Sequence, residues 1–159
     1  MPFGTTAEWP AAKSGRSAAG NLSMEGSVRR VELTWEGDMR FRGGEPGGPT
    51  TFIDADNATA PGPMLTLLLA AAACSGADVV SILGKMRVGL AALRIEVEGR
   101  RQAQDPKRLR SLRFTFHVKG GAVDQAKVRR AVELSLQKYC SVVHSLAPDI
   151  AVEYELDLA

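Results

Sequence analysis

Residues 61–88 have the sequence PGPMLTLLLAAAACSGADVVSILGKMRV, and the rest of the chain can be arranged around them. The stretch consists mainly of leucine, alanine, valine and methionine, and leucine, alanine and methionine are strong helix formers. Pro61 and Pro63 suit the first turn of a helix, because that turn does not use the amide hydrogen that proline lacks. The stretch therefore predicts one long helix, which we expect to end at Gly89.

Polar residues later in this expected helix fall on a single line. The remaining surface is apolar nearly all round, a pattern typical of a helix that protein covers on several sides. Ser75 and Asp78 interrupt the apolar run before the roughly 20 residues that cross a bilayer, so we expect a buried central helix and no membrane span. The polar line, at spacings i, i+4, i+7 and i+11, consists of Cys74, Asp78, Ser81 and Lys85.

The composition is that of an ordinary globular protein. The 159 residues suit one domain, and 45% hydrophobic and 24% charged residues match a soluble chain with a sizeable core. A net charge of +2 gives no reason to expect a nucleic-acid partner. The basic cluster within residues 100–113 has no interleaved aromatic residues for base stacking, which favours a solvated hairpin over a phosphate-binding patch.

Residues 1–26 are rich in glycine, alanine, serine and proline without periodicity, and we expect them to form a flexible tail. They contain no apolar core of a secretory signal, so we expect a cytoplasmic protein. In that reducing compartment, the two cysteines are more readily understood as redox-active or catalytic than as a structural disulfide.

Alternating apolar and polar residues predict strands on both sides of the central helix. Three strands with short connections precede it and indicate an antiparallel meander. A second antiparallel pair follows, then a second helix capped by Asp124 over residues 124–144, and a final strand. This order predicts an α+β fold in which two helices pack against antiparallel sheets. The expected strands are residues 27–36, 39–43, 50–55, 92–101, 109–118 and 150–158.

Two motifs together resemble the OsmC/Ohr family, the osmotically inducible protein C and organic hydroperoxide resistance proteins. They are AAACSGADVVSILGKM, residues 71–86, and AVELSLQKYCSVVHSL, residues 131–146, with the second cysteine 66 residues after the first. The DVVSIL segment is closer to the OsmC-like branch than to the dedicated hydroperoxide-resistance enzymes. The resemblance implies one OsmC-like domain over residues 27–159. It also implies an intertwined homodimer, with each long helix buried by the partner's sheet.

The resemblance further implies a thiol peroxidase that reduces organic hydroperoxides without a cofactor. Cys74 would attack the peroxide as a thiolate, and Cys140 would resolve the resulting sulfenic acid to a disulfide that an external dithiol reopens. Because Cys74 is in the middle of a helix among apolar residues, we expect it to need a nearby cation. In the family an arginine from the early strands assists. Arg40 and Arg42 both lie in that region, and Arg42 is preferred because it precedes the glycine-rich loop.

The sequence departs from the family pattern at the start of the central helix. The family has a glutamate there, whereas this chain has Met64 and Leu65. An alternative function is therefore a dimeric small-molecule or lipid-binding protein with little or no peroxidase activity. Each cysteine, taken alone, is also compatible with a small buried core residue.

Metal binding receives little support from residue spacing. Cys140 and His144 are four residues apart, but His117 lies in a strand and no second short-spaced pair completes a zinc site, so we expect no metal. Asp78, one turn after Cys74, could hold a cation or a water near the thiol. An unpaired Asp78 carboxylate would instead oppose thiolate formation.

Overall fold

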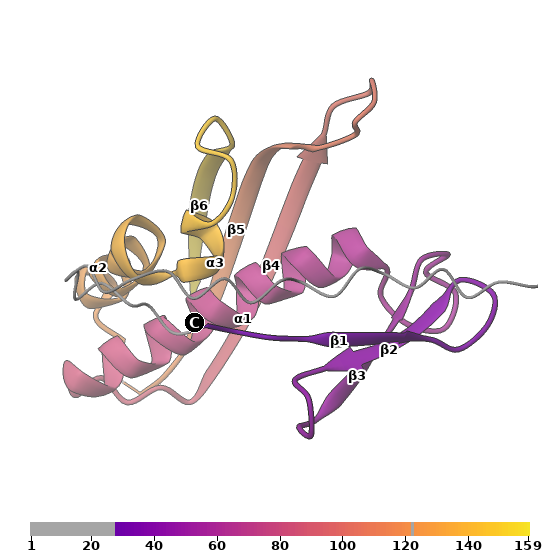
Figure 1. Ribbon diagram of the computed structural model, residues 1–159. Helices are drawn as coiled ribbons and strands as arrows, with labels where there is room; N and C mark the ends of the chain where they lie inside the picture. The colour runs from indigo at the N-terminus through magenta and orange to yellow at the C-terminus, as the bar shows by residue number, and fades with distance from the viewer. Residues whose placement is uncertain (1–27, 122) are drawn as a thin grey trace, which may run out of the picture. The chain divides into compact units, whose positions relative to one another are not determined.

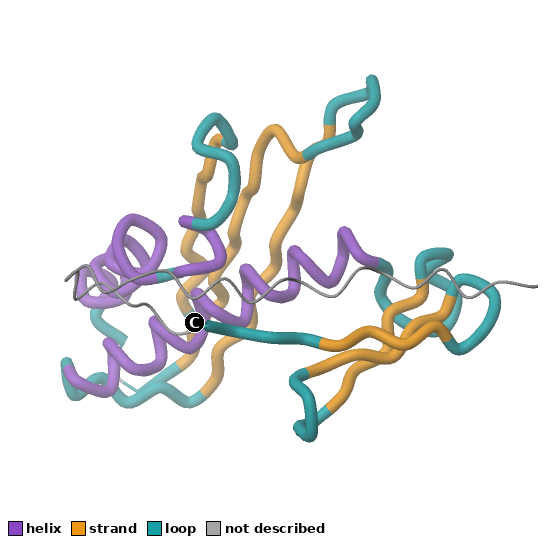
Figure 2. Tube along the Cα trace, in the orientation of Figure 1, coloured by secondary structure: helices purple, strands orange, loops and turns teal. Residues whose placement is uncertain are grey.

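The computed structural model describes residues 28–121 and 123–159, so the expected tail at residues 1–26 lies outside the described residues. From Val31 to Ala159 the chain forms one compact unit. Strands and helices follow one another in the predicted order, and the predicted α+β class is confirmed (Figure 1). Figure 2 shows the strands in two sets, which are two separate three-stranded sheets.

The first sheet is the predicted antiparallel meander of β1 (Glu32–Trp35), β2 (Arg40–Gly44) and β3 (Thr50–Asp54). Its β1–β2 turn uses left-handed backbone at Gly37 and Asp38, with φ of 101° and 50°. Much of the apolar surface of this sheet is not covered within the chain. The large apolar side chains left exposed on its strands are Leu33, Trp35 and Phe52.

The central helix, α1 (Pro63–Lys85), begins at the predicted prolines, with Gly62 as its N-cap. Its expected end at Gly89 is wrong by a few residues. Met86 is the C-cap, and Arg87 takes the left-handed conformation with φ of 57°, so this residue turns the chain out of the helix.

One face of α1 is buried in the chain and another is not. The helix contacts β4 (Ala92–Arg101), α2 (Gln125–Leu134), η1 (Ser135–Tyr139) and α3 (Ser141–His144). Its buried residues include Ser75, Val79 and Leu83. Leu69 and Val80 remain 56% and 49% exposed. By length and composition alone, α1 could cross a membrane, a test that the core helices of soluble proteins also pass. Ser75 and Asp78 lie within α1 and do not bring it below that length, and both side chains form hydrogen bonds within the fold.

The second sheet consists of β4 (Ala92–Arg101), β5 (Leu109–Lys119) and β6 (Ala151–Leu158). β4 and β5 form the predicted antiparallel pair, but β6 runs parallel to β5. The expectation of purely antiparallel sheets is therefore corrected to one antiparallel and one mixed sheet. The cause is the helical segment between β5 and β6, which returns the chain to the end of the sheet where β5 began. The side chains that β5 contributes to the core are Leu109, Leu112, Phe114, Phe116 and Val118.

The second predicted helix is interrupted. α2 (Gln125–Leu134) begins as predicted, with the Asp124 carboxylate accepting from the backbone N–H groups of Ala126 and Lys127 at 2.9 and 3.3 Å. A π-helical turn, η1 (Ser135–Tyr139), follows, and Cys140 then adopts an extended backbone with ψ of 94°. The chain resumes as the short α3 (Ser141–His144). Cys140 therefore sits at a break between two helical segments.

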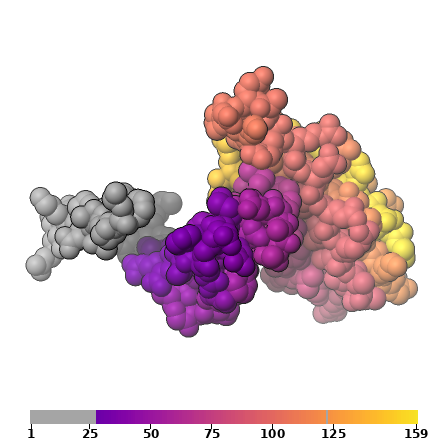
Figure 3. Space-filling model, turned by 90° about the vertical axis from the view of Figure 1, so that its right-hand side faces the viewer, coloured from indigo at the N-terminus to yellow at the C-terminus, as the bar shows by residue number. Residues whose placement is uncertain are grey.

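The basic cluster lies at one end of β4 and β5, next to their connection, which projects at the top of Figure 3. Its arginines bind nearby carboxylates on the protein surface, so much of its charge is neutralised locally. These ion pairs are Arg100–Glu98, Arg108–Asp149, Arg110–Asp149 and Arg113–Glu153.

Candidate active site

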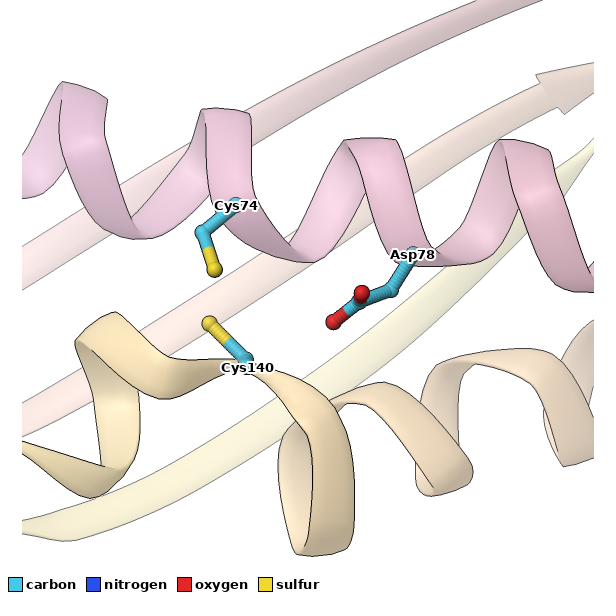
Figure 4. Close-up of side chains that lie close together, drawn as sticks. All are labelled: Cys74, Asp78 and Cys140. Atoms are coloured by element: carbon cyan, nitrogen blue, oxygen red, sulfur yellow. The ribbon is translucent and has the colours of Figure 1, made fainter. Parts of the chain in front are cut away.

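The two cysteines face each other across the contact between α1 and the break at Cys140. Figure 4 shows both sulfur atoms pointing into the same space, with the carboxylate of Asp78 beside them. The two Sγ atoms and one Asp78 carboxylate oxygen all lie within 4.8 Å of one another. Both cysteines are free thiols. Side chains that are 66 residues apart in the sequence are thus brought within reach of a common reactant.

The two thiols differ in exposure. Cys140 is fully buried, whereas Cys74 is partly exposed. A small molecule arriving from solvent therefore reaches Cys74 before it reaches Cys140.

The pKa of the Cys74 thiol lies below its ordinary value. Burial is the largest influence and raises this pKa, but hydrogen bonds from the Val142 backbone N–H and from the Cys140 and Ser141 side chains outweigh it. The Sγ of Cys74 lies 3.8 Å from the Oγ of Ser141. The negative charge of Asp78 raises the pKa by a smaller amount. Hydrogen-bond donors in the first turn of α3 thus favour the thiolate form of Cys74. From the sequence we expected a cation in this role.

The pKa of the Cys140 thiol lies above its ordinary value, mainly because the thiol is buried. A hydrogen bond from Ser75, with Oγ 3.3 Å from the Cys140 sulfur, lowers this pKa but does not compensate. The nearby Cys74 sulfur raises it further. The site therefore pairs one thiol whose pKa is lowered with one whose pKa is raised, a difference that suits a nucleophile and its partner.

Two buried serines hold this arrangement in place. Ser75 donates to Cys140, and Ser135 donates to the Oδ2 of Asp78 at 2.9 Å. Both serines are fully buried. The sequence did not mark them as site residues, because Ser75 was interpreted as an interruption of the apolar run and Ser135 falls inside the helix expected over residues 124–144. One feature of the sequence could have indicated these two residues: each is a serine at a helical position that periodicity assigns to the protein interior.

The predicted polar line on α1 continues away from the thiols into an open cavity. This cavity has a volume of about 520 Å³. Asp78 lies where the cavity and the cysteine pair meet, so the polar line connects the thiols with a space that a small molecule can enter. The residues of the cavity wall include Asp78, Ser81, Lys85, Leu134 and Tyr139.

Within one chain, the contacts of the two predicted arginines are with residues other than the cysteines. Arg42 lies on β2, where it binds Glu36 at 2.6 Å and stacks over Phe52, with 3.9 Å between the guanidinium carbon and the ring centroid. Arg40 binds Asp38 at 2.9 Å. In the described part of the chain, no arginine is among the main causes of the shifted pKa of Cys74. The first turn of α1 has no acidic residue, as its sequence requires.

The predicted histidines lie elsewhere. His117 is on β5, with its Nδ1 2.6 Å from the carboxylate of Asp157. His144 ends α3, although it is only four residues from Cys140. Within residues 28–121 and 123–159, the one group of three or more clustered metal-ligand side chains consists of Cys74, Asp78 and Cys140.

The α+β fold thus presents a partly exposed thiol with a lowered pKa to a second, buried thiol with a raised pKa. The sequence profile of the family described as OsmC-like protein matches residues 55–155, and the chain belongs to this family. Protein YhfA of Escherichia coli strain K12 is 34% identical over 130 residues, which cover 80% of this chain and 97% of YhfA. The resemblance inferred from the two cysteine motifs is confirmed.

Solved structures share the fold. A hypothetical protein from Aquifex aeolicus VF5 matches with a TM-score of 0.72 and 27% identity, covering 84% of this chain and 98% of that one. An OsmC like protein from Mycoplasma pneumoniae matches with a TM-score of 0.73 at 15% identity, with the same coverage of 84% and 98%. The organic hydroperoxide resistance protein OhrB of Bacillus subtilis has a TM-score of 0.57 and 16% identity, covering 82% and 98%. The last two similarities concern the fold alone.

The lowered pKa of Cys74 predicts that iodoacetamide alkylates this residue at a pH below that needed for free cysteine, because the reactive thiolate forms at lower pH. The pH profile is measured by mass spectrometry of the modified peptides. Ser141→Ala removes a donor to the thiolate and shifts the midpoint upward, whereas Asp78→Asn removes a negative charge and shifts it downward. Equal midpoints for Cys74 and Cys140 would contradict this assignment.

Proposed function

We propose that this protein is a thiol peroxidase that reduces organic hydroperoxides, with Cys74 as the attacking residue and Cys140 as the resolving residue. The observation that carries the proposal is the pair of facing free thiols whose pKa values are shifted in opposite directions. The name of the structural relative OhrB, an organic hydroperoxide resistance protein, supports the substrate class.

The reaction proceeds in three balanced steps. The Cys74 thiolate attacks the terminal oxygen of the hydroperoxide, the O–O bond breaks, and the alkoxide leaves as the alcohol after taking a proton from solvent. Cys74 is then a sulfenic acid. The Cys140 sulfur attacks it, water leaves, and a disulfide forms. An external dithiol supplies the two electrons that restore both thiols, and the proposal therefore includes a reducing compartment such as the cytoplasm.

The positions of the two sulfurs support the second step. A disulfide needs the sulfurs at about 2.05 Å, and they lie within 4.8 Å while reduced. Cys140 is at the break between η1 and α3 rather than inside a continuous helix. Disulfide formation then requires the two sulfurs to approach by no more than about 2.8 Å.

The proposal includes a homodimer in which the first sheet of each chain covers the long helix of the other. Within one chain, α1 leaves Leu65, Leu69 and Val80 exposed, and the first sheet leaves Leu33, Trp35 and Phe52 exposed. Apolar surfaces of this extent are typical of faces that another protein chain covers. Pairing the two faces across a dimer buries both.

In such a dimer, β2 of one chain also brings Arg42 toward Cys74 of the other, where its charge stabilises the thiolate during attack. The family glutamate is missing at the helix start, but Arg42 already has a carboxylate partner in Glu36. We propose that Glu36 orients Arg42 in place of that glutamate.

A second function, binding of a small apolar molecule or lipid with little peroxidase activity, is favoured by two observations. The first turn of α1 lacks a carboxylate, and α1 and β4 border an apolar cavity of about 210 Å³. The side chains that line this cavity include Leu65, Leu68, Leu69, Ile95 and Val97.

The peroxidase proposal predicts that one equivalent of cumene hydroperoxide removes two thiols from the native protein under anaerobic conditions. Cys140→Ser stops at a sulfenic acid on Cys74, and Cys74→Ser does not react, because the buried Cys140 is shielded from the peroxide. Thiol titration and intact mass follow the products. If all three proteins consume peroxide no faster than free cysteine, the peroxidase function fails for this substrate and the binding function is favoured.

The arginine assignment predicts that Arg42→Ala slows oxidation of Cys74 by about 100-fold, the usual cost of removing one charged donor from a developing negative charge. Arg40→Ala is the matched control, since Arg40 is on the same strand and its ion pair with Asp38 is also exposed. Stopped-flow peroxide consumption provides the rates. Equal rates for the two variants would remove Arg42 from the mechanism.

The dimer predicts a particle of twice the chain mass in sedimentation equilibrium. Leu69→Glu places a charge in the proposed interface and weakens association by about 30-fold or more. Gln125→Glu, at an exposed position of α2, introduces the same residue outside the interface and leaves association unchanged. A monomeric native protein would contradict the proposed arrangement.

A further inference from the structure

The cysteine pair and Asp78 form a group with the donors of a soft-metal site. Two sulfur atoms and a carboxylate oxygen lie within 4.8 Å of one another. In a tetrahedral zinc site with Zn–S of about 2.3 Å and Zn–O of about 2.0 Å, neighbouring ligand atoms are about 3.5–3.8 Å apart. Each ligand atom therefore needs to move by no more than about 1 Å to surround one ion.

We propose that Cys74, Asp78 and Cys140 bind a single zinc-class divalent cation. Thiolates select zinc over magnesium and calcium, which prefer all-oxygen sites, and two sulfurs with one carboxylate suit tetrahedral coordination. The three side chains fill three of the four positions. The fourth is left for water or an added ligand, since the group lies where a partly exposed thiol meets an open cavity.

Residue spacing pointed to a different partner for Cys140. His144 follows it by four residues, but the helix break puts Asp78 of α1, not His144, next to the cysteine sulfurs. Cys74 and Asp78 are themselves four residues apart on one face of α1. The site thus consists of an i, i+4 pair from one helix and a single residue from the break.

Hydrogen bonds from two serines already orient two of the three proposed ligands, Asp78 and Cys140. Ser135 donates to Oδ2 of Asp78, and Ser75 donates to the sulfur of Cys140. Both serines are fully buried, so neither hydrogen bond competes with solvent. Hydrogen bonds of this kind around ligands fix their direction and change metal affinity by about 10-fold to 100-fold when they are removed.

Binding has a definite balance of charge and protons. Each thiol that is protonated releases its proton to solvent, and the ion is then held by two thiolates and one carboxylate. No electron is transferred. If the proposed peroxidase function holds, an ion in this site occupies both sulfurs, so it prevents Cys74 from attacking peroxide until a chelator removes it.

The test uses the full-length reduced protein and anaerobic titration with cobalt(II), followed by displacement with zinc(II). We expect one equivalent of cobalt, with a sulfur-to-cobalt charge-transfer band and the strong visible bands of tetrahedral cobalt. Asp78→Asn, Cys74→Ser and Cys140→Ser each weaken binding by at least about 100-fold, and Ser135→Ala weakens it by about 10-fold. Asp56→Asn is the matched control at an exposed aspartate and leaves affinity within about twofold.

Far-UV circular dichroism establishes that each variant is folded. Absence of the charge-transfer band, or an unchanged affinity in folded Asp78→Asn, would overturn the three-ligand site. Peroxide consumption is measured separately, on protein treated with chelator. If the protein binds the metal but does not consume peroxide, the metal site is supported and the proposed peroxidase function is contradicted. If it consumes peroxide but does not bind the metal, the peroxidase function is supported and the metal site is contradicted.

Discussion

The site depends on the contact between Cys74 in the middle of α1 and the helix break at Cys140. A continuous helix over residues 124–144 would direct the backbone N–H groups after Cys140 along its own axis, where they would bond the preceding turn. Instead, a π-helical turn and the extended backbone of Cys140 turn the first residues of α3 toward α1. That change delivers a second thiol, a hydroxyl and a backbone donor to Cys74 at once.

Because of this contact, a few neutral groups give the two thiols different pKa values. Hydrogen-bond donors compensate for the burial of Cys74, whereas for Cys140 burial dominates. Asp78 adds a negative charge that opposes the Cys74 thiolate and completes a set of three metal-ligand atoms. The same geometry therefore suits a two-electron thiol reaction and, as proposed, the binding of a cation that would suspend that reaction.

Only part of the apolar surface of α1 is buried within the chain. Val79 and Leu83 enter the core of the chain, while Leu69 and Val80 remain exposed, as does Trp35 on the first sheet. Exposed large residues on both elements give a physical reason for the proposed dimer, because the hydrophobic effect favours covering them together. The proposed position of Arg42 depends on that assembly, since its contacts within one chain are with Glu36 and Phe52.

The sequence by itself determined the α+β class, the element order, the cap at Asp124 and the family, because these depend on local periodicity and on residues within one motif. Tertiary structure decided the direction of β6, the break at Cys140 and the partners of Ser75, Ser135 and Asp78. Periodicity could not give these features, because a serine on an inward helical face looks like core until a second helix supplies its partner. The donors that lower the pKa of Cys74 likewise come from a segment more than 60 residues away, and only packing brings them there.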